Sequence, residues 1–151
     1  FLHDTFNFLF YTQLSDSKDE TLSALATKSL KEVKYHLRHS TNWLIRLGDG
    51  TEESNAKAQE SLEQIWQFTA ELFEMDEIDT ELLNLGIAVN NKALKLEWDK
   101  IVNNTLKKAK LNRPEDGYMA TGGKKGMHTE YLGFLLAEMQ FLKRAYPDAK
   151  W

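Results

Sequence analysis

Glu32, His36 and His39 are the residues whose types and spacing come nearest to a metal site. Carboxylates and imidazoles one helical turn apart can share a metal ion, and di-iron bundle proteins do so through Glu-x-x-His pairs. The spacing here departs from that pair, because Val33 lies three residues before His36 and Tyr35 lies three residues after Glu32. We therefore predict no bound metal. We expect His36 to be partly buried against a neighbouring helix, and His39 to lie at the rim or surface.

Asp4 is the only carboxylate in residues 1–14 and joins Glu32, Val33 and His36 as a candidate for a degenerate metal site. It could face the centre of a helical bundle or pair with a neighbouring cation. A buried carboxylate without a metal needs a cation or hydrogen-bond donors. For Glu32, the nearest cations in the sequence are Lys28, Lys31 and Lys34.

Residues 121–126 read Thr-Gly-Gly-Lys-Lys-Gly and precede an expected helix. Backbone N–H groups of such a loop, with the ammonium groups of Lys124 and Lys125, could hold a phosphate, for instance one of coenzyme A. The order of residues is not that of a Walker A loop. A solvated turn is the preferred interpretation, and a phosphate or coenzyme A contact is the alternative.

Other catalytic chemistry finds no support in the sequence, and no catalytic residue is predicted. The sequence has no cysteine, which excludes disulfides and a thiolate nucleophile and fits a reducing cytoplasm. No grouping of serine, histidine and acid has a spacing that implies nucleophilic catalysis. The tryptophans at helical core spacings are expected to be packing aromatics: Trp43, Trp66 and Trp98.

The charge pattern argues against nucleic acid as a partner. The 151 residues carry 19 basic and 23 acidic side chains, interleaved, for a net charge of −4. No basic block is available to neutralise a phosphate backbone. Residues 1–14, the most apolar stretch, are too short and too polar to span a bilayer, so no membrane segment is predicted.

The elements expected to position these residues are helices, because the sequence is rich in Leu, Ala, Glu and Lys and has only two prolines. Ser17 and Glu20 have the spacing of a capping box before one long helix, about 42 Å at about 1.5 Å per residue. Residues 74–79 are expected to be an acidic connection and residues 112–127 an extended loop. Helices are predicted at residues 1–14, 20–47, 51–73, 80–85, from 90 onward, and 129–146.

Two segments carry a resemblance to a known family. The first is Lys-Glu-Val-Lys-Tyr-His-Leu-Arg-His-Ser at residues 31–40, followed by Trp43 and by Arg-Leu-Gly-Asp-Gly-Thr-Glu-Glu-Ser at residues 46–54. The second starts with Gly-Gly-Lys-Lys-Gly-Met-His-Thr-Glu-Tyr-Leu-Gly at residues 122–133 and continues to Trp151. Together they resemble the structural subunits of bacterial phenylacetyl-CoA epoxidases, and the similarity runs along essentially the whole chain.

The resemblance implies a single ferritin-like helical domain over residues 1–151, the C-terminal portion of a longer subunit whose first two core helices precede this chain. It implies membership of a multicomponent oxygenase that epoxidises the ring of phenylacetyl-CoA. A sister subunit would hold the di-iron site, and a separate reductase with FAD and an Fe–S centre would supply electrons from NADPH. Val33 agrees with a metal-free partner, because a glutamate there would complete Glu-x-x-His with His36.

The resemblance leaves two alternatives and one question open. A complete chain could hold its own di-iron centre and oxygenate a substrate directly, or it could bind coenzyme A through Lys124 and Lys125. The partners implied are the catalytic subunit and the other epoxidase components in the cytoplasm. Whether the chain also forms a homo-oligomer stays open.

Overall fold

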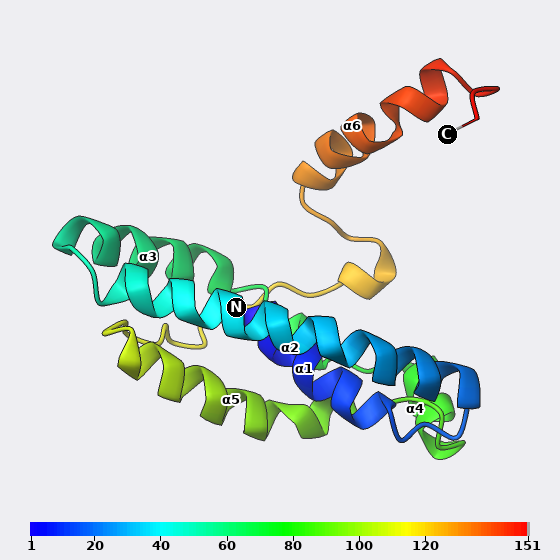
Figure 1. The fold of residues 1–151 in the computed structure, drawn as a ribbon, viewed down its shortest axis with the longest axis horizontal. Helices are drawn as coiled ribbons and strands as arrows, with labels where there is room; N and C mark the ends of the chain where they lie inside the picture. The colour runs from blue at the N-terminus through cyan, green and yellow to red at the C-terminus, as the bar shows by residue number, and fades with distance from the viewer. Residues whose placement is uncertain (151) are drawn as a thin grey trace. The chain divides into compact units, whose positions relative to one another are not determined.

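The protein is all-α in a computed structural model that describes residues 1–150, as the sequence predicts (Figure 1). The described residues form six α-helices and no strand, consistent with a ferritin-like bundle. The chain divides into two compact units, residues 1–120 and 121–151, so a single domain over the whole chain stays a prediction. The helices are α1 (Leu2–Leu14), α2 (Glu20–Gly48), α3 (Glu52–Trp66), α4 (Glu77–Asn84), α5 (Asn91–Lys108) and α6 (Tyr131–Ala145), with 3₁₀ turns η1 (Ala70–Phe73) and η2 (Gly123–Lys125).

The first unit is organised around α1, which packs against both α2 and α5, while α3 packs against α2 (Figure 1). Apolar side chains from α1, α3, η1 and α5 form its core. The apolar spacing of α5 predicts a core side of Leu94, Trp98, Ile101, Val102 and Leu106, and all of these are buried except the half-buried Ile101. The remaining buried members are Leu2, Phe6, Leu62, Trp66, Phe73, Val89, Ala109 and Leu111.

Trp98 is the fully buried centre of this core. Its indole Nε1–H donates a hydrogen bond of 2.9 Å to the carbonyl oxygen of Leu2 in α1. Its ring lies 5.8 Å from that of Trp66 and 5.4 Å, edge to face, from that of Phe73. Buried tryptophan needs a partner for its N–H, so one side chain joins α5 to α1, α3 and η1.

A polar network fixes the segment that follows α5 against α3 and α5. Arg113 lies over the ring of Trp66, with its Cζ 4.9 Å from the ring centroid. Its Nη1 donates to Asp99 Oδ1 at 2.8 Å, and Asp99 also accepts from Lys95 at 2.9 Å. Trp66 Nε1–H donates to Asp116 at 2.9 Å. Charge-assisted bonds of this kind hold a segment that has no helix of its own.

The turn between α2 and α3 depends on the lack of a side chain at Gly48. A Cβ at this position would lie 2.1 Å from the carbonyl oxygen of Ala109, just beyond α5. Asn55 then donates to the carbonyl oxygens of both Gly48 and Lys110, at 2.6 and 3.2 Å. A hydrogen bond to Asp49 raises the pKa of Lys110, which pairs with that carboxylate across the same corner.

One predicted helix cap and two predicted helix boundaries are wrong. Asp19, not Ser17, caps α2, accepting from Leu22 N–H, while the Ser17 hydroxyl donates to the carbonyl of Ile87. The third helix ends at Trp66 rather than residue 73, because tighter bonds replace the α-helical pattern: Thr69 N–H and Oγ1 both donate to the Trp66 carbonyl. The fourth helix begins at Glu77, inside the predicted connection, with a capping box made by Asp76 and Asp79.

Several residues predicted to pack are exposed in the described structure. Trp43 is 51% exposed, so the packing role predicted for it is wrong, whereas Trp66 and Trp98 confirm theirs. The apolar spacing of the predicted helix at residues 51–73 also indicates packing for Ile65 and Phe68, and both are exposed. The sequence pattern identifies the helices correctly and overestimates how much of each circumference they bury.

The second unit contains α6, which begins at Tyr131 and ends at Ala145, close to the predicted residues 129–146. None of its residues is buried. Seven positions place large apolar side chains along one side of the helix at spacings of three and four. These positions are Tyr131, Leu132, Leu135, Leu136, Met139, Leu142 and Tyr146.

Gly48→Ala should destabilise the protein by about 2 kcal/mol or more, a fall in Tm of roughly 5 °C or more, because the added Cβ meets a backbone oxygen that cannot rotate away. Thermal unfolding followed by circular dichroism measures this. Gly117→Ala is the matched control, since a Cβ there meets nothing within 4 Å. Equal Tm values for the two variants would contradict the close approach at Gly48.

Trp98→Phe should cost about 2 kcal/mol, because it removes the hydrogen bond to Leu2 and leaves part of the core unfilled. The free energy of unfolding is measured by urea denaturation. Trp43→Phe makes the same chemical change at an exposed site and should stay within about 0.5 kcal/mol of the unchanged protein. A loss of equal size in both variants would refute the role of Trp98.

Candidate functional site

The degenerate-site candidates on α2 differ in burial. Val33 is 8% exposed and faces the interior, whereas Glu32 and His36 are exposed. The sequence predicts a partly buried His36, and that prediction is wrong; His39 is exposed, as expected. No ion pair among the described residues includes Glu32, so its pairing with a nearby lysine finds no support.

Asp4, the fourth candidate, lies on α1 and is partly exposed. Among residues 1–150, no Lys, Arg or His side chain forms an ion pair with Asp4, so the pairing alternative finds no side-chain partner. Within residues 1–150, no three His, Asp or Glu side chains come close enough together to hold a metal ion. The structure therefore does not bring Asp4, Glu32 and His36 together as a ligand set.

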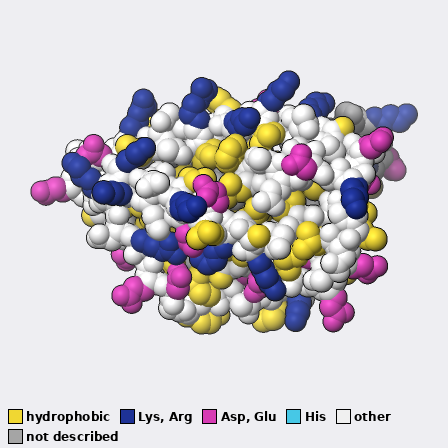
Figure 2. All heavy atoms as spheres, turned by 90° about the horizontal axis from the view of Figure 1, so that it is seen from below, with side chains coloured by type: hydrophobic (Ala, Val, Ile, Leu, Met, Phe, Trp, Pro, Cys, Tyr) yellow, Lys and Arg dark blue, Asp and Glu magenta, His cyan; other side chains and the backbone are white. Residues whose placement is uncertain are grey.

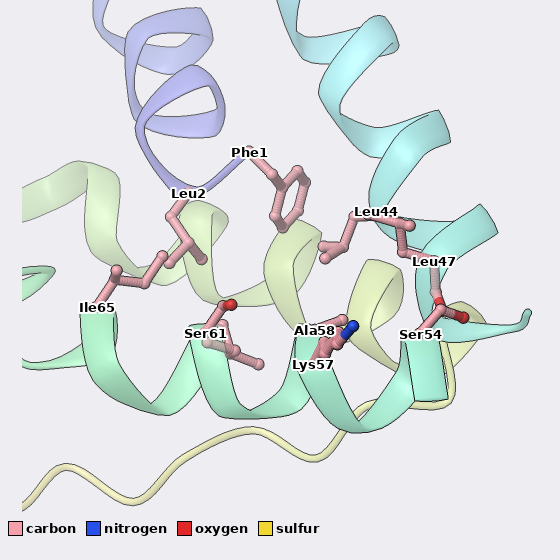
Figure 3. Close-up of a pocket in the computed structure, with 10 residues that line it drawn as sticks. Phe1, Leu2, Leu44, Leu47, Ser54, Lys57, Ala58, Ser61 and Ile65 are labelled. Carbon is pink, nitrogen blue, oxygen red and sulfur yellow. The ribbon is translucent and has the colours of Figure 1, made fainter. Parts of the chain in front are cut away.

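An apolar hollow lies where the start of α1, the end of α2 and one side of α3 meet (Figure 3). Its volume is about 360 Å³. Phe1 projects into the space beside Leu44, and Ala58 and Ser61 of α3 form its floor. Polar groups are few: Ser54, Ser61 and Lys57 are the polar residues of the lining. Without convergent polar groups, the hollow can bind apolar surface but has nothing to orient a reacting group.

The loop of Lys124 and Lys125 folds as the short turn η2, and several of its backbone N–H groups are already used. The N–H groups of Lys125 and Met127 both donate to the carbonyl of Gly122, and that of Gly126 donates to Gly123. These donors cannot at the same time cradle a phosphate. The loop as folded resembles the solvated turn preferred from the sequence, and a coenzyme A contact stays the alternative.

The outward face of α2 holds residues that the sequence analysis did not single out. Tyr35, Arg38 and Arg46 lie there beside His39 and Trp43, in ring-to-ring and cation-to-ring contacts. A signal for them was available, because Tyr35, His39 and Trp43 follow one another at four-residue spacing. The face of the molecule drawn in Figure 2 shows no such row, because basic, acidic and hydrophobic side chains are mixed on it.

Taken together, these features define an all-α bundle protein whose described residues offer helix faces and an apolar hollow rather than a polar reaction centre. The chain belongs to the family described as phenylacetic acid catabolic protein, whose match covers residues 1–151. It is 46% identical over 148 residues to the C subunit of the 1,2-phenylacetyl-CoA epoxidase of Escherichia coli (strain K12). The aligned region covers 98% of this chain and 60% of that relative. The family predicted from the two sequence segments is confirmed.

No helix in residues 1–150 combines the length and the apolar character that a membrane crossing demands.

Replacing both Lys124 and Lys125 by alanine should not change the result of a calorimetric titration with phenylacetyl-CoA. The variant should bind as tightly as the unchanged protein, or not at all if that protein does not bind. A phosphate site at this loop would need the backbone N–H donors as well as the two ammonium groups, and several of these N–H donors are engaged within the loop. A double change of Lys107 and Lys108 to alanine, on exposed positions of α5, controls for the loss of two charges. A selective loss of affinity in the loop variant would establish the coenzyme A alternative.

Proposed function

We propose that this chain is part of a structural subunit of a phenylacetyl-CoA epoxidase, and that it binds and stabilises the catalytic di-iron subunit of that assembly. The observation that carries the proposal is the buried side chain of Val33. A glutamate at this position would complete a Glu-x-x-His pair with His36, and valine offers no ligand atom to a metal. The similarity to an epoxidase subunit of Escherichia coli supports the same assignment.

The chemistry then belongs to other chains. The di-iron centre of the catalytic subunit would activate dioxygen, with electrons delivered from NADPH through a reductase that carries FAD and an Fe–S centre. The valine at position 33, where a Glu-x-x-His pair with His36 would need a glutamate, supports a metal-free role for this chain. What this chain contributes is packed helix surface, which can fix the position of helices in a neighbouring subunit.

The setting proposed for the assembly is the cytoplasm. These 151 residues contain no cysteine and so depend on no disulfide, which is compatible with the reducing cytoplasm, where the NADPH-linked reductase is also expected. The partners proposed are therefore soluble epoxidase components, with the catalytic subunit as the direct contact.

Size-exclusion chromatography of the full-length protein, with and without the catalytic subunit, tests the proposal. The two should elute together, and the mixture should oxygenate phenylacetyl-CoA when reductase and NADPH are supplied. The full-length protein alone should show no turnover and iron far below one atom per chain, because Val33 removes a ligand position.

Two results would contradict the proposed structural role. Near-stoichiometric iron in the full-length protein, together with turnover in the absence of the sister subunit, would make this chain an oxygenase in its own right. Separate elution of the two proteins, over a range of concentrations, would refute the binding role. The catalytic subunit measured alone provides the reference for both elution and turnover.

A further inference from the structure

The outward face of α2 carries a continuous row of aromatic and basic side chains in contact with one another, here called the α2 stripe: Tyr35, Arg38, His39, Trp43 and Arg46. The rings of Tyr35 and His39 stack at 6.0 Å between centroids, and those of His39 and Trp43 lie 6.4 Å apart. The Arg38 guanidinium lies 5.6 Å from the centroid of the Tyr35 ring, and that of Arg46 lies 5.7 Å from the Trp43 ring.

Most of the stripe lies far from the side of α2 that carries the buried Val33. At about 100° per residue, Tyr35, Arg38 and Arg46 lie about 140° to 160° around the helix axis from Val33, His39 about 120° and Trp43 about 80°. Tyr35 is 52% exposed, and Arg38, His39 and Arg46 are exposed as well. These large side chains are thus not part of the packing of the first unit.

The charge on this part of α2 is opposite to that of the whole chain. Residues 28–46 contain the cations Lys28, Lys31, Lys34, Arg38 and Arg46 but only one carboxylate, Glu32, in a chain of net charge −4. Neither arginine of the stripe forms an ion pair with a carboxylate of residues 1–150. Both guanidinium groups therefore keep their N–H donors available to an outside acceptor.

The composition of the stripe favours a protein surface as that acceptor. Arginine, tyrosine and tryptophan dominate the binding energy of protein interfaces. Because the rings and guanidinium groups already contact one another, less side-chain freedom is lost on binding. A guanidinium group matches a carboxylate with two parallel hydrogen bonds. A nucleic-acid backbone would instead require a basic area wider than one helix, which the net charge of this chain does not suggest.

We propose that the α2 stripe is the face that binds a carboxylate-rich surface of the catalytic subunit. This inference rests on the proposed function and adds the location and the chemistry of the contact. Charged contacts of this kind accelerate association and set the orientation of the partners, so the complex should weaken as salt is added.

The test uses the full-length protein with Arg38→Glu and Arg46→Glu together, titrated with the catalytic subunit by calorimetry at low and high salt. The Kd should rise about tenfold or more at low salt, because both guanidinium groups are replaced by charges that repel carboxylates. The dependence of Kd on salt should also become shallower in the variant. A second variant, Tyr35→Ala with Trp43→Ala, should raise Kd without changing the salt dependence.

Lys107→Glu with Lys108→Glu on α5 is the control, since it reverses two exposed cations that, like the stripe arginines, form no ion pair among the described residues. Its Kd should change less than about threefold. Circular dichroism and Tm of all variants verify that they fold. If the charge-reversal variant loses both its fold and its binding, the milder variant Arg38→Gln with Arg46→Gln is measured instead. It should also weaken binding.

The outcomes separate the two proposals. If the unchanged protein binds the catalytic subunit and the stripe variants bind it equally well, the α2 stripe is not the contact, although the proposed function stands. That result is also the one expected if the stripe serves a phosphate-rich ligand. If the unchanged protein does not bind the catalytic subunit, the proposed function fails and this inference fails with it.

Discussion

The indole of Trp98 is the constraint on which the first unit depends. A ring of this size fills the space where α1, α3, η1 and α5 meet, and its single N–H must find an acceptor inside the core. The carbonyl of Leu2 provides it. The bond fixes how far α1 can slide along α5, and α1 in turn positions α2, against which it packs. The direction in which α2 presents its outer face therefore follows from a buried hydrogen bond on another helix.

Periodicity predicted the helices well because burying one side of a helix requires apolar residues every three or four positions. The core positions of α5 follow directly from that rule. The boundaries were harder, since neither glycine nor proline marks the end of α3. The chain leaves the helix there through bonds made by Thr69, which a sequence pattern does not single out. Likewise, the acidic run before Leu82 has the composition of a connection, and only the structure shows that Asp76 and Asp79 cap one another.

The candidate site illustrates the difference between residue identity and residue direction. Sequence alone showed that Val33 cannot be a ligand, and that conclusion needs no coordinates. It did not show that His36 is exposed, because a position at the flank of an apolar stripe is compatible with either side. Trp43 lies at such a flank too, and its hydrophobic character suggested packing. Only the three-dimensional neighbours revealed that its ring contacts His39 edge to face and lies beside Arg46, in a row of exposed side chains.

The contact between Gly48 and Ala109 joins two helix ends through backbone alone, with Asn55 bonding to the chain on both sides of it. A relative that carries a side chain at position 48 must hold these two helix ends farther apart. At that greater separation, one amide group could not reach both carbonyl oxygens. Across the family, the residues at positions 48 and 55 should therefore change together. The residue types at these two positions would then indicate how closely the ends of α2 and α5 approach each other.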